Sequence, residues 1–90
     1  MIKFQRITTA DTALYNYMEQ LMTASFPPEE YRSLEELRNY TDTKTHFYCN
    51  IILHDDTPVG FITYWDFGQF FYVEHFAIDS SQRNGGHGKN

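Results

Sequence analysis

Cysteine and basic residues are scarce in this chain of 90 residues. Its single cysteine, Cys49, cannot form an intrachain disulfide, which excludes the disulfide-stapled class of small secreted domains. Because the N-terminal segment also lacks the apolar core of a secretion signal, we expect a cytoplasmic protein. Seven Lys and Arg residues against twelve Asp and Glu residues give a formal net charge of −5. This balance argues against a non-specific nucleic-acid binder, whose affinity comes from clustered basic side chains.

Long apolar runs are also missing. No run approaches the roughly 18 residues that a membrane span needs, so we expect a soluble protein. Aromatic residues, in contrast, make up 18% of the chain, far more than a disordered chain carries, and we expect order up to about Ile78. The length suits one small domain over residues 1–90.

The N-terminal half predicts a strand followed by two helices. Ile2 and Phe4 alternate with polar residues, which is typical of a half-buried strand, here ending near Ile7. Thr8 followed by Asp11 resembles a capping box, and a helix is expected from about residue 11 to 24. The core face of that helix is predicted from helical spacing to hold Leu14, Met18, Leu21 and Met22.

The segment after the first predicted helix contains Pro27 and Pro28, which end it. Ser33 followed by Glu36 is a second capping-box pattern and predicts a short second helix. Residues 26–31, between the two helices, have two interpretations. They form a wall of an acceptor pocket, or they are only a rigid, charged connection.

From residue 47 the apolar period changes from about 3.6 to 2, which predicts strands near residues 47–53, 59–65 and 70–78. Short turns between them indicate an antiparallel meander. The predicted fold is therefore α+β, an antiparallel-rich mixed sheet built from one strand, two helices and a three-strand meander. The aromatic residues at its C-terminal end have two interpretations, core or the wall of an acceptor pocket, and most of them are assigned to the core: Trp65, Phe67, Phe70, Phe71, Tyr72 and Phe76.

A glycine-rich segment follows the last predicted strand directly and contains the pattern R-x-x-G-x-G from Arg83 to Gly88. Glycines allow positive φ and close backbone approach, so that successive N–H groups can converge on an anion. A Walker loop does not fit, because Asn90 stands where that loop needs Ser or Thr. The pattern favours a pyrophosphate-binding loop over the alternative of a disordered terminus.

The segments 71–79 and 82–89 together resemble the fourth strand and the acetyl-CoA pyrophosphate loop of the GNAT (acyl-CoA N-acyltransferase) family. The predicted order of elements before them agrees with that family. The resemblance implies an N-acetyltransferase that transfers an acetyl group from acetyl-CoA to a primary amine. It implies a pantetheine arm hydrogen-bonded by Phe76, Ala77 and Ile78, and a pyrophosphate held by the backbone amides of Arg83, Asn84, Gly85, Gly86, His87 and Gly88.

Acyl transfer to an amine needs a donor for the oxyanion and an acceptor for the amine proton. A backbone N–H near Phe76 is the candidate donor, and Glu74 is the candidate catalytic base. The alternative for Glu74 is a solvated residue on an exposed strand face. His75 is predicted to point to the opposite face, as a packed or surface histidine. No metal site is expected, because metal-ligand spacing is absent among His46, His54, His75, His87 and Cys49.

In the family, a helix and further strands follow the pyrophosphate loop, whereas this sequence stops at Asn90. We therefore expect the N-terminal part of a longer domain, whose activity needs the remainder. An uncovered sheet face also predicts a homo-oligomer. The alternative function is a non-catalytic oligomeric binding or interaction module that reuses half of the GNAT fold. The acceptor, a small amine or a peptide, is not identified by the sequence.

Overall fold

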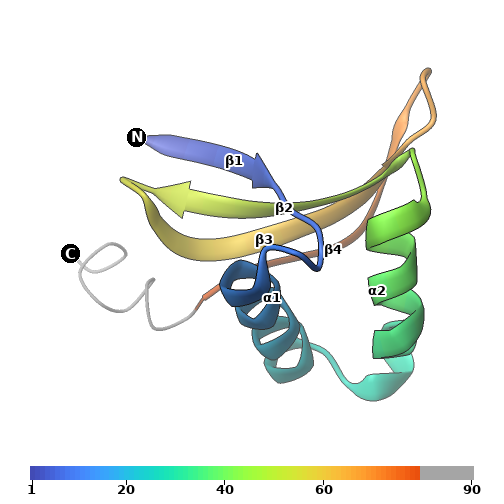
Figure 1. The fold of residues 1–90 in the computed structure, drawn as a ribbon, viewed down its shortest axis with the longest axis horizontal. Coiled ribbons are helices and arrows are strands. Elements are labelled where there is room, and N and C mark those ends of the chain that lie inside the picture. The colour runs from blue at the N-terminus through green and yellow to red at the C-terminus, as the bar shows by residue number, and fades with distance from the viewer. Residues whose placement is uncertain (80–90) are drawn as a thin grey trace.

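Four antiparallel strands form one sheet that carries both helices on the same face (Figure 1). The structure is a computed structural model and describes residues 1–79. The strands lie in the order β1-β2-β3-β4. This confirms the α+β prediction. The elements in chain order are β1 (Ile2–Arg6), α1 (Thr12–Ser25), the 3-10 turn η1 (Pro28–Glu30), α2 (Leu34–Thr43), β2 (Phe47–His54), β3 (Thr57–Asp66) and β4 (Phe71–Ile78).

The two helices begin in different ways. At α2 the predicted cap is present, because the Ser33 hydroxyl accepts a hydrogen bond from the Glu36 backbone N–H at 3.1 Å. At α1 only half of the predicted capping box forms. The Asp11 carboxylate accepts from the backbone N–H of Thr8 at 2.9 Å, but no side chain caps the helix. This pair closes a turn just before α1, so the helix starts at Thr12.

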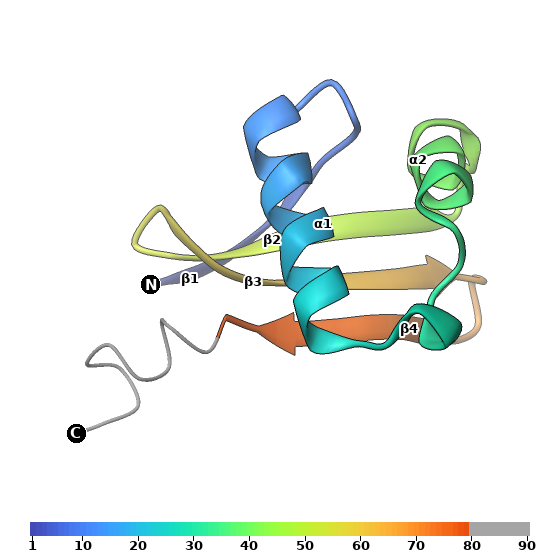
Figure 2. The same ribbon diagram turned by 90° about the horizontal axis from the view of Figure 1, so that it is seen from below.

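The core lies between the sheet and the helices, with α1 against β3 and β4 and α2 against β2 (Figure 2). Met18 and Met22 are fully buried as predicted, whereas Leu14 and Leu21 are only partly buried. Alternate residues of β2 and β3 point into the same space. The core consists of Ile7, Tyr15, Met18, Met22, Leu37, Phe47, Cys49, Ile51, Leu53 and Phe61.

The other face of the sheet carries exposed apolar side chains. β1 was predicted to be half-buried, but Ile2 and Phe4 are 53% and 60% exposed, because no described residue covers this face. The assignment of the aromatic residues to the core is also wrong except for Trp65, which packs against the core. Residues on the turn after β3 or on β4 are exposed, namely Phe67, Phe70, Phe71, Tyr72 and Phe76.

A two-residue turn joins β2 to β3 and sets their register. Asp55 and Asp56 both have positive φ, 51° and 70°, and His54 pairs with Thr57. Positive φ at both central residues is the property of the type I′ turn, whose twist matches that of a hairpin. The short turn predicted between these two strands is thus a tight hairpin turn.

Candidate functional site

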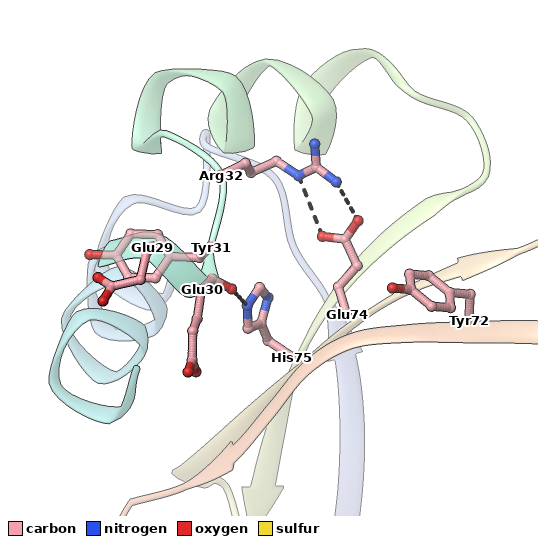
Figure 3. A pocket seen from close by; sticks show the side chains of 7 residues that line it. All are labelled: Glu29, Glu30, Tyr31, Arg32, Tyr72, Glu74 and His75. Carbon is pink, nitrogen blue, oxygen red and sulfur yellow. Dashed lines mark hydrogen bonds and ion pairs between the residues drawn. The ribbon is translucent and has the colours of Figure 1, made fainter. Parts of the chain in front are cut away.

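A hollow of about 340 Å³ lies between the segment that joins the two helices and the middle of β4 (Figure 3). The joining segment supplies one wall and β4 supplies the other. Of the two interpretations of residues 26–31, the structure supports a pocket wall. The lining residues are Glu29, Glu30, Tyr31 and Arg32 from the segment and Tyr72, Glu74 and His75 from β4.

An irregularity in β4 shapes this wall. Tyr64 pairs with Val73 and Thr63 pairs with His75, so Glu74 is an extra residue in the β3–β4 ladder. In a regular strand, neighbouring side chains point to opposite faces, but a bulge resets this alternation. Glu74 and His75 therefore both point toward the helices, as Figure 3 shows. The prediction that His75 points away from Glu74 is wrong for this reason.

The Glu74 carboxylate is held by two partners. The Arg32 guanidinium donates to both of its oxygens, from Nε to Oε1 at 3.4 Å and from Nη2 to Oε2. The Trp65 indole N–H also donates to Oε2, at 2.8 Å. The Glu74 side chain is only 11% exposed, so it is not the solvated residue of the alternative interpretation. Neither Arg32 nor Trp65 was identified as a site residue from the sequence.

Arg32 is itself fixed by its surroundings. Its guanidinium lies over the Tyr40 ring, 4.5 Å from the ring centre, and its Nη1 is 3.8 Å from a Glu36 carboxylate oxygen. The hydrogen bond to Glu74 raises the pKa of Arg32 above its usual value. A guanidinium in this position is a permanent charge that links α2 to β4. No local sequence pattern marked it, because its partner Glu74 is 42 positions away.

His75 links β4 to the segment between the helices. Its Nε2 lies 2.7 Å from the backbone carbonyl oxygen of Glu30. The imidazole also makes edge-to-face contacts with Phe26 and Tyr31, at centroid distances of 4.9 and 6.5 Å. The ring is therefore held in one orientation on the pocket wall.

The predicted cofactor-binding residues divide into two groups. Phe76, Ala77 and Ile78 lie at the end of β4, which pairs only with β3 among the described residues. Its outer edge can accept an extended ligand by strand addition. The predicted pyrophosphate loop, Arg83 to Gly88, lies outside the described residues.

Other chemistries find less support in the part of the chain that the structure describes. Within residues 1–79 no group of three or more His, Cys, Asp or Glu side chains is placed to hold a metal ion. Burial raises the pKa of the Cys49 thiol to about 12, which keeps it protonated and unsuited to be a nucleophile. Among the described helices, none combines the length and the apolar character of a membrane span.

Comparisons with known proteins concern the family and the overall fold. The sequence model of the acetyltransferase (GNAT) family matches residues 12–90. The chain belongs to the GNAT family. A solved structure from Bacteroides thetaiotaomicron, described as a proposed acetyltransferase of this family, is 61% identical and superposes with a TM-score of 0.90. The match covers 97% of this chain and 49% of that one, so the GNAT chain described here spans about half the length of its relative. No curated protein matches the sequence.

Proposed function

We propose that this GNAT chain belongs to a cytoplasmic N-acetyltransferase that transfers the acetyl group of acetyl-CoA to a primary amine on a small molecule or peptide. The observation that carries the proposal is the pocket at the β4 bulge. Glu74 and His75 line this pocket, and the outer edge of β4 beside it is unpaired among the described residues. Family membership supports an acyl-CoA donor. The acceptor would enter the pocket from the side of the segment between the helices.

The donor would lie along β4. In this proposal the amides of the pantetheine arm pair with Phe76, Ala77 and Ile78, whose strand has an unpaired edge among the described residues. The thioester carbonyl then reaches the bulge, where a backbone N–H near Phe76 would stabilise the oxyanion. The pyrophosphate would be bound by Arg83, Asn84, Gly85, Gly86, His87 and Gly88.

Glu74, the candidate base of the sequence analysis, is expected in this proposal to affect the rate of the reaction. Its carboxylate lies on the pocket wall and is paired with Arg32. Glu74→Gln is expected to lower kcat in an active form of the enzyme, because the amide loses the charge and one of the acceptor oxygens. An unchanged kcat would show that Glu74 has no catalytic role.

Binding of the donor tests the proposal most directly. We would titrate acetyl-CoA into the 90-residue chain and into a form extended beyond Asn90, by calorimetry and by thermal shift. The extended form is expected to bind and to acetylate amines, and Gly86→Val in the same form is expected to weaken binding, because a side chain blocks close approach of the backbone. Absence of both heat and thermal stabilisation in the extended form would contradict the proposal.

A second function is favoured by one observation, the exposed apolar face of the sheet. Phe4, Phe71 and Val73 are 49–66% exposed and line a hollow with Ile62 and Tyr64. A non-catalytic oligomeric interaction module would use this face and would have no need of acetyl-CoA. Self-association without any binding of acetyl-CoA would favour this alternative.

A further inference from the structure

Two side chains at the β4 bulge, Glu74 and His75, face the pocket. They differ in how many of their possible proton-accepting atoms already take part in hydrogen bonds. Glu74 Oε1 accepts from Arg32, and Oε2 accepts from both Arg32 and Trp65. Oε2 is thus fully hydrogen-bonded, and Oε1 keeps one lone pair. A proton on Glu74 would remove the charge that pairs with Arg32 and leave that guanidinium without its nearest counter-charge, so the contacts favour a carboxylate that holds Arg32 and Trp65.

The contact with Glu30 determines the tautomer of His75. The partner of Nε2, at 2.7 Å, is a backbone carbonyl oxygen, and a carbonyl can only accept. Nε2 must therefore carry the hydrogen. Because a neutral imidazole has a single N–H, the lone pair lies on Nδ1. Among the described residues, none makes a hydrogen bond to Nδ1.

The position of the ring is fixed before any substrate arrives. Phe26 contacts it from the end of α1, and Tyr31 contacts it from the segment before α2. The carbonyl of Glu30 holds its far nitrogen. A base that is oriented by a hydrogen bond at its second nitrogen is arranged in the same way as the histidine of a catalytic triad.

We infer that His75, through Nδ1, takes the proton of the acceptor amine, and that Glu74 is a positioning residue that ties Arg32 and Trp65 to β4. This inference rests on the proposed function. The amine nitrogen attacks the thioester carbonyl, the C–N bond forms, and one N–H proton moves to Nδ1. The C–S bond then breaks, and the thiolate takes up a proton as the imidazolium gives one up. One proton has moved from nitrogen to sulfur, and nothing is oxidised or reduced.

The charges around His75 are compatible with a transient imidazolium. Glu29 and Glu30 line the same pocket with exposed carboxylates, Tyr31 and Tyr72 are phenols, and the charge of Arg32 is balanced by that of Glu74. The pocket wall thus carries more negative than positive charge.

A first experiment needs no turnover. Long-range ¹H–¹⁵N NMR of the ¹⁵N-labelled 90-residue chain reports which imidazole nitrogen is protonated. Neutral His75 is expected as the Nε2–H tautomer. His75→Gln identifies its signals among those of the other histidines. The Nδ1–H tautomer would overturn the inference, because the lone pair would then face Glu30.

A second experiment uses an active form of the enzyme. His75→Gln places an amide N–H near the position of Nε2, so the tether to Glu30 can be kept while the base is lost. It is expected to lower kcat by about 100-fold to 10,000-fold with little change in the Kd of acetyl-CoA. In His75→Ala, added imidazole is expected to restore part of the activity. His54→Gln, on the β2–β3 hairpin, serves as the control and should leave activity unchanged.

The outcomes are separable. Full activity in His75→Gln, or no rescue of His75→Ala by imidazole, would assign His75 a structural role and overturn the inference, while the acetyltransferase proposal would stand. If the unmodified enzyme acetylates no amine and does not bind acetyl-CoA, the proposed function itself has failed, and the inference fails with it.

Discussion

At the scale of single residues, two carboxylates of low exposure are each paired with an arginine, and one thiol is buried. Glu19 is 9% exposed and is held by Arg38, whose Nε and Nη2 donate to its two oxygens at 2.8 and 2.9 Å. Glu74 is held by Arg32 in the same forked manner. Cys49 is buried without a charged partner and therefore remains a neutral thiol.

The reactivity of Cys49 tests this description. With a pKa raised by burial to about 12, against a usual value of 9.0, the thiolate fraction at pH 8 is about 1000-fold lower than for a free cysteine. Alkylation of the native chain by a maleimide is therefore expected to be at least that much slower than alkylation in denaturant. Equal rates would show that the thiol is accessible and ionised in the folded state.

At the scale of elements, close contacts between neighbouring strands and helices determine the geometry of the site. β3 approaches β4 so closely at Gly60 that an added Cβ would lie 2.4 Å from the backbone oxygen of Ala77. Thr9, in the turn before α1, donates to Asp42 of α2 from its backbone N–H at 3.0 Å. These contacts align the end of β4 and hold the two helices together.

Gly60→Ala is expected to destabilise the chain by about 1–3 kcal/mol, because a backbone oxygen cannot move aside without opening the β3–β4 pairing. Gly68→Ala is the control. Gly68 has φ of 88° but no atom within 4 Å of an added Cβ, so that variant has only the conformational penalty of about 1 kcal/mol. Urea denaturation measures both. Amide shifts of Ala77 and Ile78 should change with Gly60→Ala alone, and unchanged shifts would contradict the contact.

The Thr9–Asp42 contact predicts a pH dependence. Hydrogen bonds from the Thr9 hydroxyl and backbone N–H lower the pKa of Asp42 below its usual value of 3.8. A group whose pKa is lower in the folded state stabilises the fold above the unfolded pKa, and this contribution is lost as the pH falls through the folded value. Asp42→Asn should therefore have a lower Tm than the unmodified chain at pH 7, and the difference should shrink as the pH falls below 3.8. A constant difference across that range would contradict this assignment.

At the scale of the whole molecule, the two faces of the sheet differ. Both helices cover one face (Figures 1 and 2). Among residues 1–79, the other face exposes Phe4, Phe71, Val73 and Phe76. A contiguous apolar surface of this kind is typical of an interface. The outer edge of β4 adds backbone groups that can pair with another strand.

We therefore predict that the 90-residue chain self-associates through this open face at micromolar concentrations. Sedimentation velocity measures the oligomeric state. Phe71→Gln is expected to shift the distribution toward the monomer, because Phe71 lines the apolar hollow of the open face. Phe67→Gln is the control, since Phe67 is also more than half exposed, at 51% against 66% for Phe71, but lies on the turn after β3. A monomer at all concentrations would contradict the prediction.

Much of the fold follows from local patterns. The order of strands and helices, the cap at Ser33 and the burial of Met18 and Met22 were all predicted. Each depends on residues within a turn or two of one another, where periodicity and side-chain chemistry act directly. The family resemblance led to Glu74 as the candidate base, whereas strand alternation put His75 on the wrong face, because it assumed that β4 is regular.

The arrangement of the candidate site came from contacts that join distant parts of the chain. Arg32 lies 42 positions from Glu74, and the Glu30 carbonyl lies 45 positions from His75. The bulge in β4 depends on its pairing with β3, and the exposure of Phe71 and Phe76 depends on which face the helices cover. A one-dimensional pattern shows which residues are apolar, polar or titratable. Which of these residues contact one another is decided only when the strands and helices pack. A contact between two residues far apart in the chain leaves no periodic pattern in the sequence from which it could be predicted.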